Sequence, residues 1–221
     1  MDSELTDLAG IKAVTISTLQ VIPSEGAFVD GDKTKLDGIA ALISALEAQV
    51  TALEAQIPTV AIGDFRVGGV VFWVDPTDNT HGLVCAIEDQ SVGIQWYNGS
   101  NTTTGATATA IGTGSANTTA IIANQGAVET AYAAGLARAY RGGGYTDWFL
   151  PSKDELNEMY QNMATINSTA AANGGSAFST NYYWSSTEFA LNFALLQYFY
   201  NGFQNYNNKN VTYYVRAVRA F

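Results

Sequence analysis

The chain has 221 residues, with 20 acidic against 10 basic side chains and a formal charge of −10. Nucleic-acid binding needs a basic face, so this balance all but excludes it and also disfavours sulfated polysaccharides as ligands. One cysteine (Cys85) and one histidine (His81) exclude a disulfide framework, a zinc cluster and chemistry that needs two thiols in this chain. Without a basic-then-apolar leader or an apolar run of about 20 residues, we expect no signal peptide and no membrane insertion.

Residues 1–57 are predicted to form a stalk, because they hold nine acidic and three basic side chains but a single aromatic one. Apolar residues three and four apart indicate a coiled coil of three heptads, and their mix of leucine and β-branched types favours three strands. The alternative is one amphipathic helix packed on its own domain. The predicted trimerisation residues are Leu36, Ile39, Ile43, Leu46, Val50, Leu53 and Ile57.

The stretch GDKTKLDGI, residues 31–39, resembles a short linker of bacteriophage tail fibres that leads into a trimeric shaft. Composition becomes globular near residues 58–63, and all four tryptophans follow that point. We therefore divide the chain into three parts: 1–35 as stalk and linker, 36–57 as the coiled-coil trimerisation helix, and 58–221 as the ligand-binding domain.

The first half of this domain is predicted to begin with a β-hairpin of strands 67–74 and 82–87, with His81 in a structural role at the turn. No charged residue occurs from Gln90 to Val128, and the Thr, Gly, Ala and Ser of 98–117 predict ordered coil. A helix is expected over 127–140. The glycines at 142–144 that follow it do not form a phosphate loop.

The second half begins with a capping box, since Ser152 precedes Glu155 by three residues and the apolar residues that follow have helical spacing. Strands are expected from Tyr182 onward, ending in an alternating run over 215–221. Eleven of the 22 tyrosines and phenylalanines fall between Tyr182 and Tyr214, and this clustering requires an explanation.

Four stretches together resemble one family: GGVVFWVD from residue 68, HGLV from residue 81, TDWFLPSKDEL from residue 146, and YWSSTE from residue 183 leading to VRAVR from residue 215. They are similar to the C-terminal domain of bacterial collagen-like adhesins, a domain type that also occurs as the variable protein of diversity-generating retroelements. The resemblance covers roughly residues 63–221.

The resemblance implies an α+β fold, a C-type lectin-like domain of the formylglycine-generating-enzyme-like subtype, preceded here by the trimeric coiled-coil stalk. It implies a binding function with no catalytic residues, no cofactor and no metal. Charges in a charge-poor domain are best explained by pairing, so Asp147 and Glu188 are expected to be buried or half-buried partners of basic groups. The expected structural residues are Trp148, Trp184, Phe199, Arg216 and Arg219.

In the retroelement relatives, adenine-directed mutation diversifies the segment between the two C-terminal motifs, here 189–214. Asparagine codons altered in this way cannot yield Lys, Glu, Gln, Met or Trp, and only Gln197, Gln204 and Lys209 of the segment belong to that set. Asparagines alternate irregularly with large apolar residues, which no single strand rule explains. The predicted ligand-binding residues are Phe189, Leu191, Phe193, Leu196, Tyr198, Tyr200, Phe203, Tyr206, Val211 and Tyr213.

Three functions are weighed. In the first, the chain is the tip of a phage tail fibre, a homotrimer that binds a host cell-surface receptor. It would be made in the host cytoplasm, carried in the virion and joined to other tail proteins through its N-terminus. The second is a bacterial surface adhesin for a host glycan or protein, which would need an export signal. The third is an oxidase, which this fold also houses, but its paired cysteines are missing and Cys85 is expected to pack as a small apolar residue.

Overall fold

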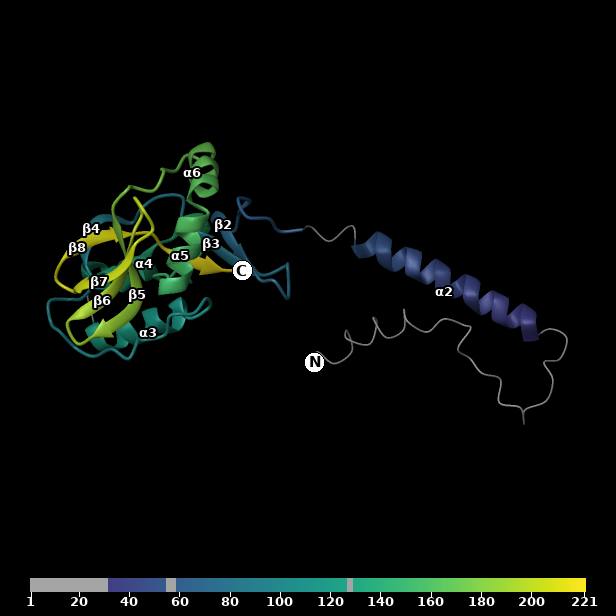
Figure 1. Ribbon diagram of the computed structural model, residues 1–221, viewed down its shortest axis with the longest axis horizontal. Coiled ribbons are helices and arrows are strands. Elements are labelled where there is room, and N and C mark those ends of the chain that lie inside the picture. Colours follow the sequence, from purple (N-terminus) through teal and green to yellow (C-terminus); the bar gives the residue numbers. More distant parts are fainter. Residues whose placement is uncertain (1–31, 55–58, 127–128) are drawn as a thin grey trace. The chain divides into compact units, whose positions relative to one another are not determined.

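The computed structural model describes residues 32–54, 59–126 and 129–221. Its contacts divide the chain into two units, Met1–Ile57 and Pro58–Phe221. The division falls where the aromatic-poor composition of the N-terminal part ends. Figure 1 shows the one described helix of the first unit, α2 (Asp32–Glu54), and the mixed helices and strands of the second.

α2 is the helix that the heptad pattern predicts, and its apolar seam is uncovered. The seam residues Leu36, Ile39, Ile43, Leu46 and Leu53 are between 45% and 63% exposed, and Val50 is half-buried. Ile57 lies outside the described residues. The helix is therefore confirmed, while the trimeric coiled coil stays a prediction.

α2 bears on the expectation that the chain has no membrane-spanning segment. By length and composition alone, Lys33–Leu53 is apolar enough to cross a membrane, and none of it is buried. Asp37 and Glu47 interrupt the apolar residues of this stretch. A helix of this kind can either associate with copies of itself or insert into lipid, and composition does not separate the two.

The first sheet of the second unit has four antiparallel strands in the order β1-β2-β3-β9. The predicted hairpin is at its centre, where Val70 pairs with Cys85 and Val71 with Val84. Because β9 pairs with β3, the C-terminal end of the chain lies beside the first strands of the unit. The strands are β1 (Phe65–Arg66), β2 (Gly69–Val74), β3 (Gly82–Cys85) and β9 (Val218–Ala220).

The second sheet has five strands in the order β4-β8-β5-β6-β7. β5 and β8 pair in parallel and the other neighbours are antiparallel. β7 is therefore one edge of this sheet and β4 the other. The strands are β4 (Ser91–Gln95), β5 (Tyr182–Ala190), β6 (Phe193–Tyr198), β7 (Gln204–Asn208) and β8 (Thr212–Val215).

The predicted alternating strand over 215–221 is wrong. Val215, Arg216, Ala217 and Val218 are all buried, and the strand is broken between β8 and β9. The chain leaves the second sheet here and joins the first, so both sides of the crossing are covered by other parts of the domain. The backbone N–H of Ala86 accordingly donates to the carbonyl of Ala217 over 2.9 Å.

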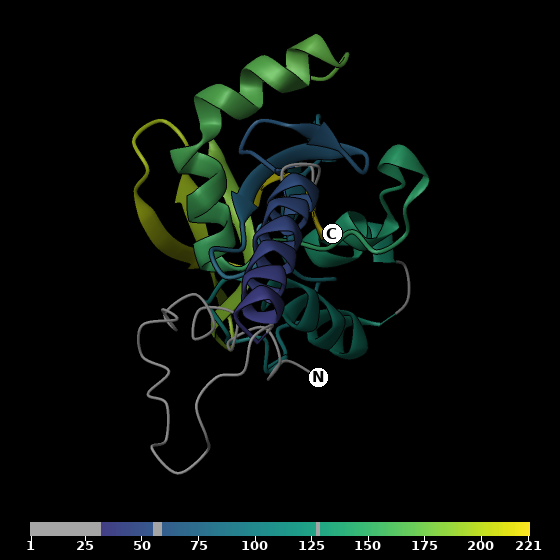
Figure 2. The same cartoon turned by 90° about the vertical axis from the view of Figure 1, so that its right-hand side faces the viewer.

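α5 (Lys153–Gln161) begins with the predicted capping box. The Ser152 hydroxyl accepts from the Glu155 backbone N–H, and the Glu155 carboxylate accepts from the Ser152 N–H at 2.7 Å. Leu156 and Met159 are buried, as their helical spacing predicts. α6 (Met163–Ala172) follows α5 and runs in a different direction (Figure 2). Asn162 lies between the two helices, and its side-chain amide donates to the Phe72 carbonyl of β2 at 3.1 Å.

The middle of the domain differs from the sequence prediction. α3 (Gly114–Gln125) was read in part as coil, because Gly, Ser, Asn and Thr are poor helix formers. Tertiary hydrogen bonds hold it: the Thr118 hydroxyl accepts from the Leu150 N–H at 3.0 Å. The helix predicted over 127–140 is shorter than expected, since only η2 (Glu129–Ala131) and α4 (Ala133–Ala139) form; residues 127–128 lie outside the described part, and η3 (Gly142–Gly144) follows.

Two clusters of buried apolar side chains fill the second unit. One contains Trp96, Trp148 and Trp184, and the other contains Phe72 and Phe199. The expected core positions of Trp148, Trp184 and Phe199 are thus confirmed, since each is fully buried. This packed core holds the strands β5 to β8 in place, and their solvent-facing side chains project from a rigid backbone.

Candidate ligand-binding surface

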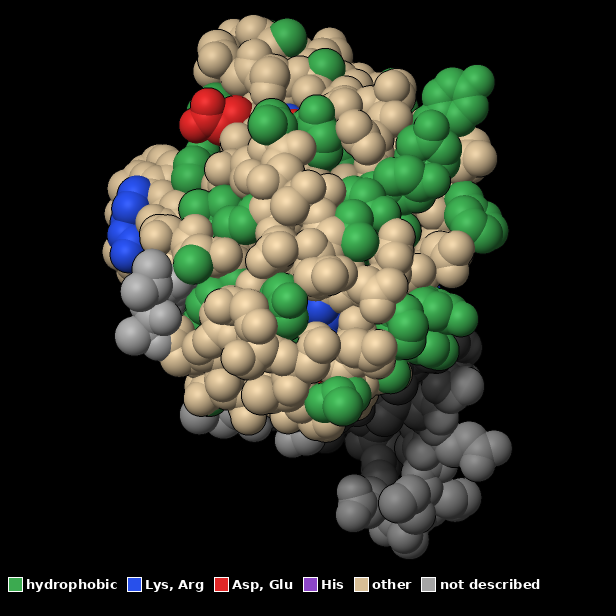
Figure 3. Space-filling view, turned by 90° about the vertical axis from the view of Figure 1, so that its left-hand side faces the viewer, with side chains coloured by type: hydrophobic (Ala, Val, Ile, Leu, Met, Phe, Trp, Pro, Cys, Tyr) green, Lys and Arg blue, Asp and Glu red, His purple; other side chains and the backbone are tan. Residues whose placement is uncertain are grey.

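The predicted ligand-binding residues differ widely in exposure. Five are open to solvent: Phe189, Leu191, Tyr200, Phe203 and Tyr206, with exposed fractions from 44% to 69%. Four are half-buried: Phe193, Tyr198, Val211 and Tyr213. Figure 3 views the unit from the side on which β4, β7 and β8 lie, and this side has scattered hydrophobic groups among neutral polar atoms with few charged side chains.

Leu196 is not a surface residue, which corrects the prediction. It is only 3% exposed and belongs to the core cluster with Trp184, its partner across the β5–β6 ladder. Strand periodicity explains the error: Ala194 and Leu196 share one face of β6, and that face covers the tryptophan-rich core.

The exposed aromatic residues lie on two opposite faces of the sheet rather than in one patch. Across the β6–β7 ladder, Leu195 pairs with Tyr206 and Ala194 with Asn207. Paired residues share a face and neighbours along a strand alternate, so Tyr206 and Asn207 project on opposite sides. The single patch predicted over 189–214 therefore becomes two surfaces.

We call the first surface the Phe189 cluster, made of Phe189, Phe193 and Tyr206. The Phe189 and Tyr206 rings stack with centroids 4.2 Å apart and planes 8° from parallel. Phe193 meets Tyr206 edge to face at 5.4 Å. Phe189 and Tyr206 remain 54% and 44% exposed, so the stack presents apolar area to solvent.

We call the second surface the tyrosine cluster, made of Tyr182, Tyr198, Tyr200 and Tyr213. Tyr182 and Tyr198 stack at 4.3 Å with planes 15° apart, and Tyr200 lies 5.7 Å from Tyr198. Tyr213 contacts Tyr182 at 5.2 Å and packs edge to face on Trp184. Sequence analysis missed Tyr182 because it precedes the predicted segment, although its pairing with Tyr198 across β5 and β6 brings it into the same surface.

The asparagines of β7 have a structural explanation that the sequence did not reveal. The Lys209 N–H donates to Asn192 O and the Tyr198 N–H to Phe203 O, so by alternation the N–H groups of Tyr206 and Asn208 point away from β6. Each is capped by the side-chain oxygen of the asparagine before it, Asn205 at 2.9 Å and Asn207 at 2.8 Å. Capping an edge strand in this way protects it from pairing with another strand.

A buried ion pair fixes the start and the end of the segment. Lys209 Nζ donates to Glu188 Oε1 at 2.5 Å and to the carbonyls of Thr102 and Leu191 at 3.1 and 2.8 Å. It also lies 4.6 Å from the centroid of the Trp96 ring. Both side chains are almost fully buried, 0% exposed for lysine and 2% for glutamate.

The same pair anchors the uncharged loop that precedes α3. The Glu188 carboxylate accepts from the N–H groups of Thr104, at 2.9 and 3.0 Å, and Gly105, at 3.1 Å. The Glu188 N–H donates to the Ala106 carbonyl at 2.7 Å. These bonds fix the loop against Glu188, at the C-terminal end of β5, a role that its low-complexity composition gave no means of predicting.

Gln197 and Gln204 are the other long polar side chains of the segment, and both are held in place. Gln197 is fully buried and its amide donates to Asn157 Oδ1 at 2.9 Å and to the Gly202 carbonyl at 3.2 Å. Gln204 donates to Gln197 Oε1 and to the Lys153 carbonyl, both at 3.3 Å. These contacts tie β6 and β7 to the beginning of α5.

Both predicted structural arginines have acidic partners, although Asp89, the partner of Arg216, was not among the acidic residues expected to pair. Arg216 is buried and its Nε donates to Asp89 at 2.7 Å, while Asp89 also accepts from the Tyr183 hydroxyl. Burial raises the pKa of Asp89, although the adjacent Arg216 opposes the shift. Arg219 pairs with Asp147 at 2.5 Å, but the Asp147 side chain is 57% exposed, so the expected burial of this carboxylate is wrong.

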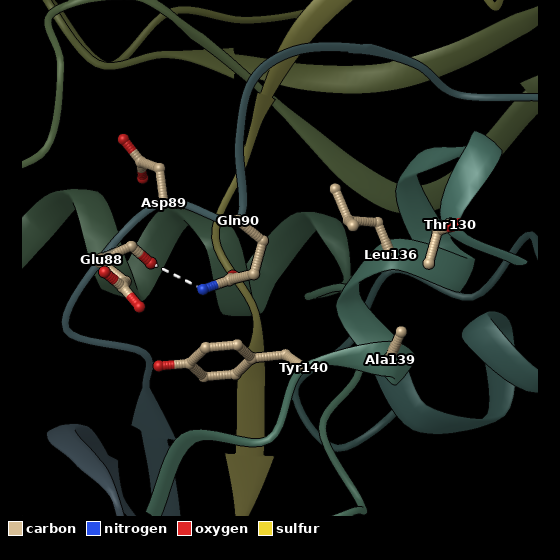
Figure 4. Close-up of a pocket in the computed structure, with 7 residues that line it drawn as sticks. All are labelled: Glu88, Asp89, Gln90, Thr130, Leu136, Ala139 and Tyr140. Carbon is tan, nitrogen blue, oxygen red and sulfur yellow. Dashed lines mark hydrogen bonds between the residues drawn. The ribbon is translucent and has the colours of Figure 1, made fainter.

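The pocket in Figure 4 lies away from the segment 189–214. It is an open hollow of about 410 Å³ lined by Glu88, Asp89, Gln90, Thr130, Leu136, Ala139 and Tyr140. Its polar groups are already engaged in part: the Gln90 amide donates to the Glu88 carbonyl at 2.7 Å, and Asp89 pairs with Arg216.

The single cysteine and the single histidine, Cys85 and His81, lie in and beside the β2–β3 hairpin. Cys85 is buried in β3, and burial raises the pKa of its thiol to about 12, so it remains protonated at neutral pH. His81 Nδ1 lies 2.7 Å from Asp78 Oδ2 in the β2–β3 turn. Within residues 32–54, 59–126 and 129–221, no group of three or more His, Cys, Asp or Glu side chains could hold a metal ion.

Two sheets with helices, a buried apolar core and exposed aromatic side chains in segment 189–214 define a mixed α+β domain. Residues 85–219 match the model of the Lcl C-terminal domain, and the chain belongs to this family. The family is the C-terminal domain of the Legionella collagen-like protein, a C-type lectin-like domain found in bacterial surface adhesins. No curated protein matches the chain.

Proposed function

We propose that the chain is an attachment protein that binds a cell-surface receptor through segment 189–214 and belongs to the tip of a phage tail fibre. One observation carries the proposal: five large apolar or aromatic side chains are exposed on a segment whose long polar side chains are locked inside. Clusters of exposed apolar groups on a rigid scaffold are typical of interaction surfaces.

The chemistry of the segment suits recognition. Tyrosine offers a large contact area with few rotatable bonds, so ordering it on binding costs little entropy. Lys209 is the only charged residue from Phe189 to Tyr214, and it forms a buried ion pair with Glu188, the residue just before the segment. Contacts with a ligand there are therefore aromatic contacts or neutral hydrogen bonds.

The proposed assembly is a homotrimer held by α2. Its uncovered seam has the a/d spacing of a coiled coil, and three linked copies would raise weak single-site affinity through avidity. Light scattering after size exclusion should give about three times 23.5 kDa. A monomer would refute the coiled coil, and flotation of the chain with lipid vesicles would instead favour a membrane-spanning α2.

The tail-fibre location rests on the stretch at residues 31–39 that resembles tail-fibre linkers. Diversification of the segment is supported by its locked residues. Gln197, Gln204 and Lys209 are the three that adenine-directed mutation of asparagine codons cannot produce, and all three have fixed side-chain contacts. The asparagines support it less, because Asn205 and Asn207 cap backbone groups.

Immunogold labelling with serum raised against the purified chain tests the location. We expect label at the tips of tail fibres of particles released by the strain that carries the gene. Label on the bacterial surface would favour the second candidate, a bacterial adhesin, which the membership of the Lcl C-terminal domain family supports.

Binding by the segment is tested with fluorescently labelled protein on intact cells. Phe189→Ala with Phe203→Ala should reduce attachment by about tenfold or more, because both side chains are more than half exposed. Phe65→Ala is the matched control, since Phe65 is 46% exposed but lies in the first sheet. Equal attachment of all three proteins would refute the proposed surface.

We also propose that the domain has no catalytic role. The thiol of Cys85 is buried and protonated, and the only imidazole lies at an exposed hairpin turn beside Asp78. Neither group faces the exposed aromatic residues of the segment.

A further inference from the structure

We infer that the tyrosine cluster binds the ring of an uncharged sugar, an inference that rests on the proposed attachment function and names its ligand class. The two aromatic surfaces differ in chemistry. The tyrosine cluster carries four hydroxyl groups, whereas the Phe189 cluster has one, on Tyr206. A surface with both ring faces and hydroxyls offers what a pyranose requires: an apolar plane for its C–H groups and polar partners for its hydroxyls.

The rings of Tyr182, Tyr198 and Tyr200 follow one another in a row. Tyr182 and Tyr198 are nearly parallel, and Tyr200 extends the row from Tyr198 at an interplanar angle of 35°. Tyr200 is 69% exposed, the largest value among the aromatic residues of the segment. It therefore offers ring area to a ligand, while Tyr182 and Tyr213 are held by the core below.

Polar groups with spare hydrogen-bonding capacity border the tyrosine cluster. Asn205 and Asn207 project on the same face as Tyr198, because their ladder partners are Leu196 and Ala194. Asn207 Nδ2 donates to the Tyr213 hydroxyl at 2.7 Å. The Asn205 amide nitrogen and the hydroxyls of Tyr198 and Tyr200 make no hydrogen bond to any residue in the described part of the chain.

The charge pattern selects an uncharged ligand. The strands β4 to β8 and the turns that join β5 to β8 contain only two charged residues, Glu188 and Lys209, and these neutralise each other in the interior. A sulfated or sialylated sugar would lose hydration here without gaining a cation. A neutral sugar has no charged group to desolvate, and its hydroxyls can form hydrogen bonds with the phenol and amide groups of the cluster.

The surface is open, so binding to one copy should be weak, with Kd about millimolar for a disaccharide. Saturation-transfer NMR with the full chain and four neutral probes, lactose, maltose, cellobiose and N,N′-diacetylchitobiose, tests the inference. We expect saturable transfer to the ring C–H protons of at least one probe, unchanged between about 0.05 and 0.5 M NaCl.

Two variants assign the site. Tyr200→Ala should weaken binding of that probe by about tenfold, and Asn205→Ala should weaken it less. Phe65→Ala is the matched control, because Phe65 is 46% exposed but lies in the first sheet, outside both aromatic clusters. Near-ultraviolet circular dichroism checks that each variant keeps its packed aromatic core.

Three outcomes overturn the inference: no saturable transfer from any probe, binding by Tyr200→Ala equal to that of the parent chain, or loss of binding in Phe65→Ala alone. If cell attachment persists in the absence of sugar binding, the sugar inference fails while the proposed function stands, and the receptor is then a protein. If sugar binds but no cell type is attached, the proposed function fails on its own.

Discussion

Segment 189–214 contains two kinds of side chain, some buried and fixed in place and others exposed to solvent. Leu196, Gln197 and Lys209 are buried and fixed by packing or hydrogen bonds, whereas Phe189, Tyr200 and Phe203 are more than half exposed. Contacts of the buried residues hold the backbone in place, whereas the exposed side chains contribute little to its stability. The difference teaches that a surface can vary in chemistry while the strands that carry it stay in place.

The largest expected effect comes from breaking the buried pair. Lys209→Met leaves the Glu188 carboxylate buried without its cation and should lower the free energy of unfolding by about 3 to 5 kcal/mol. The double variant Glu188→Gln, Lys209→Met removes both charges and should recover part of this loss. Urea unfolding monitored by tryptophan fluorescence measures both, and a double variant less stable than the single one would contradict the pairing argument.

The next effect contrasts a buried residue of β6 with an exposed residue of the connection between β6 and β7. Leu196→Ala should cost about 2 to 5 kcal/mol, because it leaves a cavity beside Trp184. Phe203→Ala, at a site 55% exposed, should change stability by no more than about 0.5 kcal/mol. Similar losses in the two variants by thermal and urea unfolding would show that the segment is not divided in this way.

The asparagine caps should have a smaller effect on stability and a visible one on association. Asn205→Ala with Asn207→Ala removes three hydrogen bonds, the two caps and the Asn207–Tyr213 bond, at about 0.5 to 1.5 kcal/mol each, and frees the outward N–H groups of Tyr206 and Asn208. An uncapped edge strand should promote association beyond the oligomer of the parent chain. Sedimentation velocity measures this, with Asn192→Ala as the control; unchanged association would assign the caps to local stability alone.

The smallest expected effect is the coupling between stacked exposed rings. A double-mutant cycle of Phe189→Ala and Tyr206→Ala should give an interaction of about 0.5 to 1.5 kcal/mol, since the rings are 4.2 Å apart and nearly parallel. A cycle of Phe189→Ala and Tyr200→Ala should give none, because these residues belong to clusters on opposite faces. Coupling in the second cycle would contradict the two-surface description.

Local signals in the sequence were sufficient for several elements. The capping box at Ser152 predicts the start of α5, the heptad spacing predicts α2, and the turn between two apolar runs predicts the β2–β3 hairpin. Each depends on residues within a few positions of one another, so the interaction that forms the element is readable along the chain. The helix α3 was missed because its hydrogen bonds, such as Thr118 with Leu150, come from distant residues.

The candidate surface divides in the same manner. The sequence by itself determined that aromatic residues gather in the C-terminal segment, that this segment is nearly free of charge, and that Trp184 and Phe199 belong to the core. Only the tertiary structure decided that Leu196 faces inward, that Tyr182 joins the tyrosine cluster and that Lys209 pairs with Glu188. Strand register decides these placements, because a shift of one residue would move every side chain to the other face, and register is fixed by pairing between strands.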